Sequence, residues 1–274
     1  MSELATPASS GGTVGSEIDT TVAHSARIYN YWLGGKDNFA ADRDAAEQAI
    51  AANPGIVADV RANRAFLARA VRYLAVDCGI RQFLDIGTGL PTVSNTHEVA
   101  QEAAPESRIV YVDNDPIVLQ HARALLTSAP QGATDYVAAD LRDVDRIAQS
   151  AAQTLDFSQP VAVMMLIVLH LIGGSDQPHD LVARLMEPLA AGSYLVISHP
   201  ASDIKPAAIA EMTRRINARM GSSRGTLRDR AEVGSFFDGL DLQPPGVVQP
   251  QQWRPDGAVS SAAVTAWCGV ARKA

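Results

Sequence analysis

The chain has 274 residues, of which 47% are hydrophobic, and it carries a formal net charge of −7 at pH 7. This length suits one α/β domain with an appended segment, and the negative charge argues against nucleic acid as a partner. No apolar run reaches the roughly 18 residues of a membrane span, and no basic-then-apolar leader opens the sequence, so we expect neither a span nor a secretory signal.

Cysteine usage and one arginine-rich region bear on compartment and partners. Cys78 and Cys268 lie far apart and match no metal-ligand spacing, so we expect reduced thiols in a cytoplasmic protein and no metal site. Several arginines fall between residues 214 and 230, but acids such as Glu211 and Asp229 are interleaved with them. We therefore expect a solvated surface there rather than a site that follows phosphates.

The composition along the chain predicts three segments. Residues 1–22 are rich in Ser, Gly and Thr and have almost no large apolar side chains, so we expect a flexible arm. Residues 23–78 have helical patterns and are expected to form an N-terminal helical cap. From residue 79 onward apolar runs alternate with helical patterns, and 79–274 is expected to be the main α/β domain.

The beginning of the cap is predicted to contain two helices. Ile28 and Trp32 share one face of the first helix. The paired glycines Gly34-Gly35 predict its end. Either Asp37 or Asn38 is expected to cap the second helix.

A third helix is predicted after Asn53-Pro54-Gly55, with an apolar stripe running from Val60 to Leu74. Asn63 and Arg64 interrupt that stripe. A buried arginine must be paired, so Arg64 either extends to the surface or meets a partner in a pocket.

The main domain is expected to be a doubly wound, mostly parallel sheet, because strands and helices alternate along it. Strands are predicted at 81–86, 109–113, 134–139, 161–167 and 193–198. Helices are predicted at 92–104, 116–128, 143–153, 178–189 and 206–219. A loop is predicted after residue 220, and two extended runs around 246–248 and 263–267 are expected to form a terminal hairpin.

The segment from Phe83 to Pro91 is the most informative part of the sequence. An apolar run leads into Asp85 and is followed by Gly87 and Gly89, and a second apolar run ends at Asp113. A strand, a glycine turn, a helix and a strand tipped with a carboxylate form a nucleotide-binding half of a doubly wound sheet. Ordinary solvated acids at two strand ends are the alternative interpretation.

The ligand predicted from this segment is not a dinucleotide. A pyrophosphate site has a third glycine three residues after the second one, and Thr92 occupies that position. Asp85 stands directly before the turn, where it would repel a pyrophosphate but attract a sulfonium or an ammonium group. These features favour S-adenosylmethionine (SAM).

Four segments carry a resemblance to a known family. Residues 83–91, 110–116 and 138–143 resemble the first three motifs of class I SAM-dependent methyltransferases. From about residue 24 to the end, the chain resembles a bacterial group of S-adenosyl methyltransferases whose opening signature is similar to residues 26–43, ARIYNYWLGGKDNFAADR. The resemblance implies a Rossmann-like, seven-stranded, mostly parallel sheet and SAM as the cofactor.

The resemblance also implies a set of cofactor-binding residues at three strand ends: Asp85, Gly87, Thr88, Gly89, Asp113, Asn114, Asp140 and Leu141. In this interpretation Asp113 binds the ribose hydroxyls, and Asp140 accepts a hydrogen bond from the adenine amino group. A cap for the helix at 143–153 is the alternative role for Asp140. The chain departs from the usual pattern at Gln159, where many class I enzymes begin the fourth strand with an acid.

The helical cap is expected to close the mouth of the cofactor site. Gly34 and Gly35 are predicted to approach the cofactor, because glycine permits close contact. The predicted pocket for the acceptor contains four residues of the same segment: Tyr29, Tyr31, Asn38 and Arg64. Plain packing is the alternative for the tyrosines.

Two histidines follow predicted strands on the ligand side of the sheet, His170 and His199. Either is a candidate general base, which methyl transfer needs only when the nucleophile must lose a proton. A core role is the alternative for His170, whose neighbours are apolar.

The sequence therefore predicts a methyltransferase that modifies an oxygen or nitrogen of a small-molecule acceptor. A non-catalytic SAM-binding protein and an NAD-dependent oxidoreductase are the two alternatives.

Overall fold

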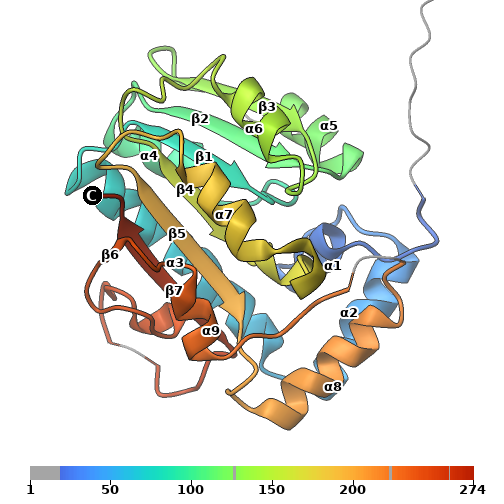
Figure 1. The fold of residues 1–274 in the computed structure, drawn as a ribbon. Coiled ribbons are helices and arrows are strands. Elements are labelled where there is room, and N and C mark those ends of the chain that lie inside the picture. Colours follow the sequence, from blue (N-terminus) through green and yellow to red (C-terminus); the bar gives the residue numbers. More distant parts are fainter. Residues whose placement is uncertain (1–18, 126–127, 222–223, 259) are drawn as a thin grey trace, which may run out of the picture.

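The computed structural model describes residues 19–125, 128–221, 224–258 and 260–274. Most of the predicted arm, residues 1–18, lies outside these ranges. A seven-stranded sheet in the order β3-β2-β1-β4-β5-β7-β6 forms the centre of the molecule (Figure 1). It confirms the predicted α/β, Rossmann-like class.

The strands are β1 (Gln82–Ile86), β2 (Arg108–Asp113), β3 (Ala133–Ala138), β4 (Ala162–Leu166), β5 (Tyr194–Pro200), β6 (Asp241–Leu242) and β7 (Ala266–Arg272). The first five are parallel, whereas β7 is antiparallel to both β5 and β6. The order of strands reverses between β1 and β4. Ligands of open α/β sheets bind at the carboxyl ends of the strands at such a point.

The helices are α1 (Ser25–Trp32), α2 (Ala40–Ala52), α3 (Ile56–Val76), α4 (Thr96–Ala103), α5 (Pro116–Leu125), α6 (Val144–Ala151), α7 (Pro178–Met186), α8 (Pro206–Asn217) and α9 (Arg230–Ser235). Three short 3₁₀ turns complete the description: η1 (Leu169–Leu171), η2 (Gly174–Asp176) and η3 (Pro250–Gln252). Among the described residues, no helix is long and apolar enough to cross a membrane.

Each face of the sheet has its own hydrophobic core, because successive strand residues point to opposite faces. On one face, Ile86 and Val112 pack with Ile147 of α6 and Leu185 of α7. On the other face, residues of α3 and α4 pack against Phe83 and Trp253. The sheet is thus covered on both sides, as expected for parallel strands.

A third core lies apart from the sheet and joins the N-terminal helices to α8. Ile28 of α1, Ala46 of α2 and Val60 of α3 pack with Ile209 and Met212 of α8. Figure 1 shows α2 and α8 side by side, next to α1. The N-terminal helices are therefore held by a helix that comes much later in the chain. Asn53, which follows α2, contacts Met212 of α8, 159 residues further on.

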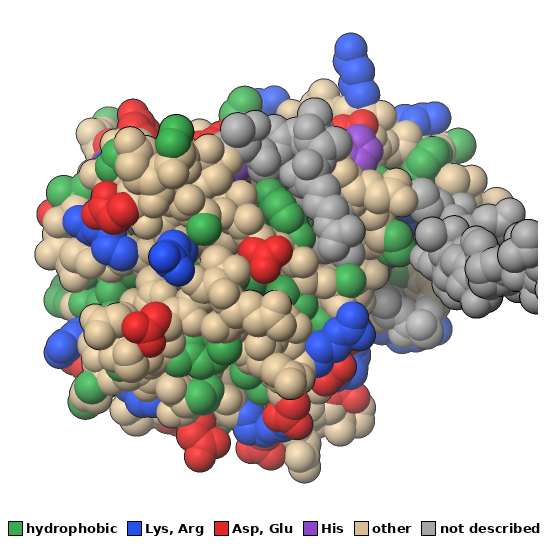
Figure 2. All heavy atoms as spheres, turned by 90° about the horizontal axis from the view of Figure 1, so that it is seen from above, with side chains coloured by type: hydrophobic (Ala, Val, Ile, Leu, Met, Phe, Trp, Pro, Cys, Tyr) green, Lys and Arg blue, Asp and Glu red, His purple; other side chains and the backbone are tan. Residues whose placement is uncertain are grey.

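Charged side chains on the surface are interspersed. Figure 2 shows Lys and Arg among Asp and Glu on the face in view. In the arginine-rich region, Arg214 and Arg215 pair with Glu211, at 2.8 and 2.7 Å, and Arg219 pairs with Asp44. Paired, exposed arginines of this kind form a solvated surface.

Three predicted details differ from the structure. The second helix begins after Phe39, whose N–H is accepted by Asp42 at 2.8 Å, and neither Asp37 nor Asn38 caps it. The predicted hairpin is reduced, because Val248 makes a single bridge to Cys268 while β7 continues to Arg272. Prolines near Val248 lack the N–H that a strand ladder needs.

The loop predicted after residue 220 contains a helix. Asp229 accepts the N–H of Glu232 at 2.8 Å, and Glu232 accepts the N–H of Asp229 at 2.7 Å. This reciprocal capping box begins α9 and is a signal that the sequence contained.

Candidate functional site

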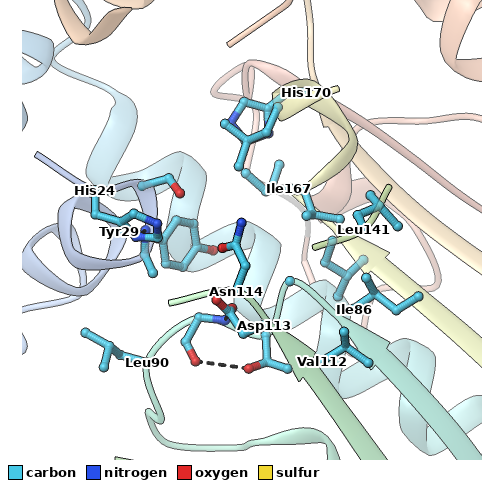
Figure 3. A pocket seen from close by; sticks show the side chains of 18 of the residues that line it. His24, Tyr29, Ile86, Leu90, Val112, Asp113, Asn114, Leu141, Ile167 and His170 are labelled. Atoms are coloured by element: carbon cyan, nitrogen blue, oxygen red, sulfur yellow. Dashed lines mark hydrogen bonds between the residues drawn. The ribbon is translucent and has the colours of Figure 1, made fainter. Parts of the chain in front are cut away.

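A cavity opens at the carboxyl ends of β1, β2 and β4, where the strand order reverses. The empty volume among its lining residues is about 1460 Å³, which includes open solvent. Figure 3 shows His24 and Tyr29 on one side, the strand-end residues Ile86 and Val112 on the other, and His170 at one end. We call this space the first cavity.

The glycine turn after β1 forms one wall of the first cavity. Gly87 has a φ of +72°, and a Cβ atom there would lie 2.4 Å from Cγ2 of Val168. Gly89 has a φ of +66° with no atom within 4 Å of such a Cβ. A side chain at position 87 would thus collide with Val168, whereas one at 89 would meet open space.

Asp85 is the buried acid before this turn, with only 5% of its surface exposed. The Thr96 hydroxyl donates to its Oδ2 atom at 2.6 Å. Burial raises the pKa of Asp85 to about 6, although this hydrogen bond and the charge of Arg64 act in the opposite direction. The carboxylate faces a cavity and makes no ion pair with a described residue.

Asp113 at the end of β2 is 8% exposed and also lines the first cavity. Its two oxygens accept the backbone N–H groups of Gly89 and Asp115, each at 2.9 Å. Burial raises the pKa of Asp113, and these two hydrogen bonds only partly offset that effect. Each oxygen keeps a further lone pair for a ligand.

Asp140, after β3, takes part in a small polar network. Asn114 donates to it at 3.1 Å, and Arg142 donates through its backbone N–H at 2.9 Å and its guanidinium at 3.0 Å. Burial alone would raise the pKa of Asp140, but the hydrogen bonds from Arg142 and Asn114 lower it. Asp143, not Asp140, accepts the capping hydrogen bond of α6.

Arg64 of α3 reaches the first cavity from the opposite side. Its Nη2 atom donates to the carbonyl oxygens of Val93 and Ser94, at 3.1 and 3.0 Å. Its Nε atom is buried without a hydrogen-bond partner among the described residues. Of the two roles considered for Arg64, the structure supports the one in a pocket.

A second cavity adjoins the first and is mostly apolar. Its empty volume is about 720 Å³, including open solvent, and it lies among α1, α3, α8 and the ends of β4 and β5. Its lining shares several residues with the first cavity, among them Tyr29, Asn63, Ile167 and His170. Ile167 has a φ of +52°, a costly conformation for a β-branched residue that is typical of functional sites.

His170 borders both cavities, and its Nδ1 atom is buried without a hydrogen-bond partner among the described residues. Burial and the nearby charge of Arg228 lower the pKa of His170 to about 4. The imidazole is therefore neutral near pH 7 and offers a free polar atom.

His199 lies behind His170 and lines neither cavity. Arg228 Nη1 lies 2.7 Å from Nε2 of His199 and also donates to the Leu169 carbonyl oxygen at 3.1 Å. Because arginine only donates, Nε2 of His199 is an acceptor and its hydrogen is on Nδ1, which faces the Pro200 carbonyl oxygen at 2.9 Å. Burial lowers the pKa of His199 to about 3.

The structure brings most of the predicted site residues to the first cavity. Those that line it are Asp85, Gly87, Thr88, Gly89, Asp113, Asn114, Asp140, Leu141, Tyr29, Arg64 and His170.

Four others from the cap segment do not line either cavity: Gly34, Gly35, Tyr31 and Asn38. A Cβ at Gly35 would lie 2.2 Å from the Asn30 side chain, and Asn38 donates to the same side chain at 2.9 Å. Tyr31 is on the surface and donates to Glu47. Gly35 and Asn38 thus support Asn30, which does line the first cavity.

Sequence reasoning missed several residues of the site: His24, Asn63, Arg142 and the supporting Arg228. His24 Nδ1 lies 3.1 Å from Oδ2 of Asp115, so it joins α1 to the loop after β2. Asn63 was noted only as an interruption of an apolar stripe, which was the available signal. No group of metal-binding side chains occurs in the described part of the chain.

Comparisons with known proteins agree with this geometry. A model of the S-adenosyl methyltransferase family matches residues 12–274. A DUF574 family protein from Streptomyces avermitilis is 44% identical, with a TM-score of 0.91 over 94% of this chain and 100% of that chain. A candidate methyltransferase from Thermobifida fusca is 39% identical, with a TM-score of 0.86 over 93% of this chain and 96% of that one.

A more distant structure shares the fold alone. The plantazolicin methyltransferase BpumL, solved with a substrate analogue and S-adenosylhomocysteine (SAH), is 11% identical, with a TM-score of 0.54 over 90% of this chain and 95% of that one. No curated protein matches the sequence. With a family model that spans nearly the whole chain and two close structural relatives, the chain belongs to the S-adenosyl methyltransferase family.

Proposed function

We propose that this family member binds SAM in the first cavity and methylates an oxygen or nitrogen of a small-molecule acceptor held in the second cavity. Membership of the family makes SAM the cofactor and sets aside the NAD-dependent alternative. When bound, SAM supplies a methyl group on a positively charged sulfur, which leaves as the neutral thioether of SAH. The residues described below bind, orient and shield the reacting groups.

The observation that carries the proposal is a pair of buried carboxylates that make no ion pair with any described residue. Asp85 and Asp113 both face the first cavity, and burial raises the pKa of each. A buried charge is costly unless it is paired. A ligand with an ammonium and a sulfonium group would supply that pairing, so the cavity suits SAM better than a pyrophosphate.

The nucleoside part of SAM fits the polar groups at the ends of β2 and β3. We assign the ribose hydroxyls to the free lone pairs of Asp113, whose orientation is fixed by Gly89 and Asp115. We assign adenine to the region of Asn114, Asp140 and Leu141. The carboxylate of Asp140 is an acceptor for the exocyclic amine, and the Leu141 N–H is a donor for a ring nitrogen.

Arg64 is assigned to the carboxylate of the methionine tail. Its unpartnered Nε atom needs an acceptor, and a carboxylate forms strong charge-assisted hydrogen bonds with a guanidinium. Asp85, which lines the same cavity, would then hold the ammonium group of the same tail.

We propose His170 as the group that takes the proton of the acceptor. It is neutral near pH 7, borders both cavities and has a free Nδ1 atom. His199 is proposed as a positioning residue, because Arg228 fixes it behind His170. We also propose that α1 and α2 act as a cap that excludes water from the sulfonium, which strengthens its attraction to carboxylates.

Calorimetry with matched variants tests the cofactor assignment. We expect wild-type protein to bind SAM and SAH, and to bind NAD about a hundredfold more weakly. Asp85→Asn should weaken SAM binding about tenfold or more, whereas Asp145→Asn, which removes an exposed acid outside both cavities, should not. Equal binding of NAD, or equal SAM affinity in the two variants, would contradict the proposal.

Transfer of a labelled methyl group then tests catalysis. A protein that binds SAM but labels no acceptor of any class would be the non-catalytic alternative.

A further inference from the structure

We infer that the acceptor is an uncharged, mostly apolar alcohol or phenol, with its body in the second cavity and its hydroxyl hydrogen-bonded to Nδ1 of His170. This inference rests on the proposed function and adds a substrate class and an attacking atom to it.

The wall of the second cavity is mostly hydrocarbon. One side is the inner face of α8, with Ile209, Met212 and Ile216, and the opposite side includes Val60 of α3 and Trp32 of α1. Pockets with walls of this kind bind small molecules mainly through burial of apolar surface. The apolar lining of the second cavity therefore favours an acceptor whose body is apolar.

Several polar side chains in this wall are already hydrogen-bonded within the protein. Asn63 donates to the Tyr29 hydroxyl at 3.0 Å and accepts from Ser198 at 2.7 Å, while Tyr29 donates to the Val60 carbonyl oxygen at 3.2 Å. Groups that are paired in this way do not require a partner from a ligand.

Two further polar side chains of the wall have protein partners. Asn217 exchanges two hydrogen bonds with the backbone of Gly225, at 2.7 and 3.1 Å. Asp59, 6% exposed, accepts the hydroxyl hydrogen of Thr265. His170 Nδ1 differs from all of these, because it is buried and has no partner.

The position of His170 places the nucleophile. It borders both cavities, so a group bonded to it lies where the methyl donor and the acceptor meet. Asp59 lines only the second cavity and is one helical turn before Asn63, which lines both. The second cavity therefore runs from His170 at the junction towards Asp59 at its far side.

Charge selects a hydroxyl over an amine or a carboxylic acid. An aliphatic amine is an ammonium at neutral pH and has no lone pair to attack with, and the positive charges of Arg228 and of the sulfonium oppose it beside His170. A carboxylate would meet no Lys or Arg, since Asp59 is the one charged side chain among the described residues that line the second cavity. A hydroxyl needs neither a counter-ion nor prior loss of a proton.

Methylation of a hydroxyl requires only SAM, His170 and water. The acceptor oxygen forms a bond to the methyl carbon while the carbon–sulfur bond breaks and its electron pair goes to sulfur. The hydroxyl proton passes to Nδ1 of His170, whose own hydrogen is on Nε2 in this tautomer. The lowered pKa of His170 keeps the imidazole unprotonated near pH 7, so it can take the proton as the oxygen becomes positive, and the imidazolium gives the proton to water after the ether leaves.

The test uses three naphthalenes that differ in one group: 2-naphthol, 2-naphthoate and 2-(aminomethyl)naphthalene. Their binding to the protein saturated with SAH is measured by calorimetry, and labelled methyl transfer is measured with SAM. We expect 2-naphthol to bind at least about tenfold more tightly than the other two and to be the one that is methylated.

Two tryptophan variants on α8 locate the binding site. Thr213 lines the second cavity and is partly exposed, so Thr213→Trp should fill the cavity and weaken 2-naphthol binding about tenfold. Ala210 is exposed on the same helix and lines neither cavity, so Ala210→Trp should change nothing. Unchanged SAM affinity and circular dichroism show that each variant is folded.

The outcomes test the charge argument, the location of the acceptor and the proposed function separately. If 2-naphthoate or the amine binds as well as 2-naphthol, the charge argument is wrong, and if Thr213→Trp leaves 2-naphthol binding unchanged, the location is wrong. Failure of SAM itself to bind would instead overturn the proposed function.

Discussion

The carboxylate of Asp113 accepts the backbone N–H of Gly89 at 2.9 Å, so the end of β2 fixes the glycine turn that follows β1. The same carboxylate accepts the N–H of Asp115. One side chain therefore orients two loops of the first cavity and keeps further lone pairs for the ligand that we propose there.

This double role makes Asp113→Ala doubly damaging. We expect SAM affinity to fall by about 2–4 kcal/mol, because two charge-assisted hydrogen bonds to ribose are lost. We also expect the ligand-free protein to lose about 1–3 kcal/mol of stability, since the N–H groups of Gly89 and Asp115 lose their acceptor. Calorimetry and thermal melts measure the two effects. Unchanged SAM affinity in a folded variant would show that Asp113 does not bind the ribose.

The raised pKa of Asp85 predicts how SAM binding depends on pH. A cationic ligand prefers the charged carboxylate, and the free group has a pKa of about 6. Affinity should therefore be constant above that value and fall as the pH drops through it, by up to about tenfold per pH unit. Burial also raises the pKa of Asp113, so its protonation weakens binding in the same direction.

Calorimetry from about pH 5 to 8 follows this change. Asp85→Asn is the control, and it should keep only the pH dependence that Asp113 causes. A wild-type affinity that stays level below pH 6 would mean that Asp85 does not face the positive charge.

The two glycines of the turn predict different defects. Gly87→Ala places a Cβ atom 2.4 Å from Val168 in a left-handed conformation, so we expect a loss of stability of at least about 2 kcal/mol. Gly89→Ala has the same backbone strain but meets open space. It should cost only about 1–2 kcal/mol of stability, while its methyl group obstructs the ligand. Thermal melts and SAM titration separate the two, and a reversed order of stability would contradict the geometry.

The buried histidines predict an NMR result. His170 and His199 should both be neutral at pH 6, because burial holds their pKa values near 4 and 3. His199 should carry its hydrogen on Nδ1, opposite the atom that accepts from Arg228. Nitrogen-15 shifts of the imidazoles report both properties.

Removing the charge of Arg228 should raise the pKa of His170. Arg228→Met is the variant, and its thermal stability is measured in parallel, since Arg228 also donates to two carbonyl oxygens. A His170 that is protonated at pH 6 in the wild-type protein would contradict its assigned role.

Sequence reasoning located the five parallel strands because most of them are short apolar runs bounded by turn residues. It located the first cavity because Asp85, Gly87, Gly89 and Asp113 stand at strand ends, and parallel strands bring those ends to one edge. Local pattern was enough in both cases.

The parts that could not be predicted depend on contacts between distant segments. Arg228 comes from a loop after α8 and reaches His199 only because Ala201 and Arg228 form a bridge beside β5. The second cavity arises where α8 packs on α1, α2 and α3. Gly34 and Gly35 carried a strong local signal, but their freedom serves the packing of Asn30 rather than a ligand.

The placement of α8 has a consequence for how such proteins diversify. The helix supplies much of the wall of the second cavity, while the acids of the first cavity come from strand ends. Substitutions at Ile209, Met212 or Thr213 would then remodel the acceptor chamber and leave the donor residues untouched. Under the proposed function, acceptor preference and SAM binding can therefore be altered separately.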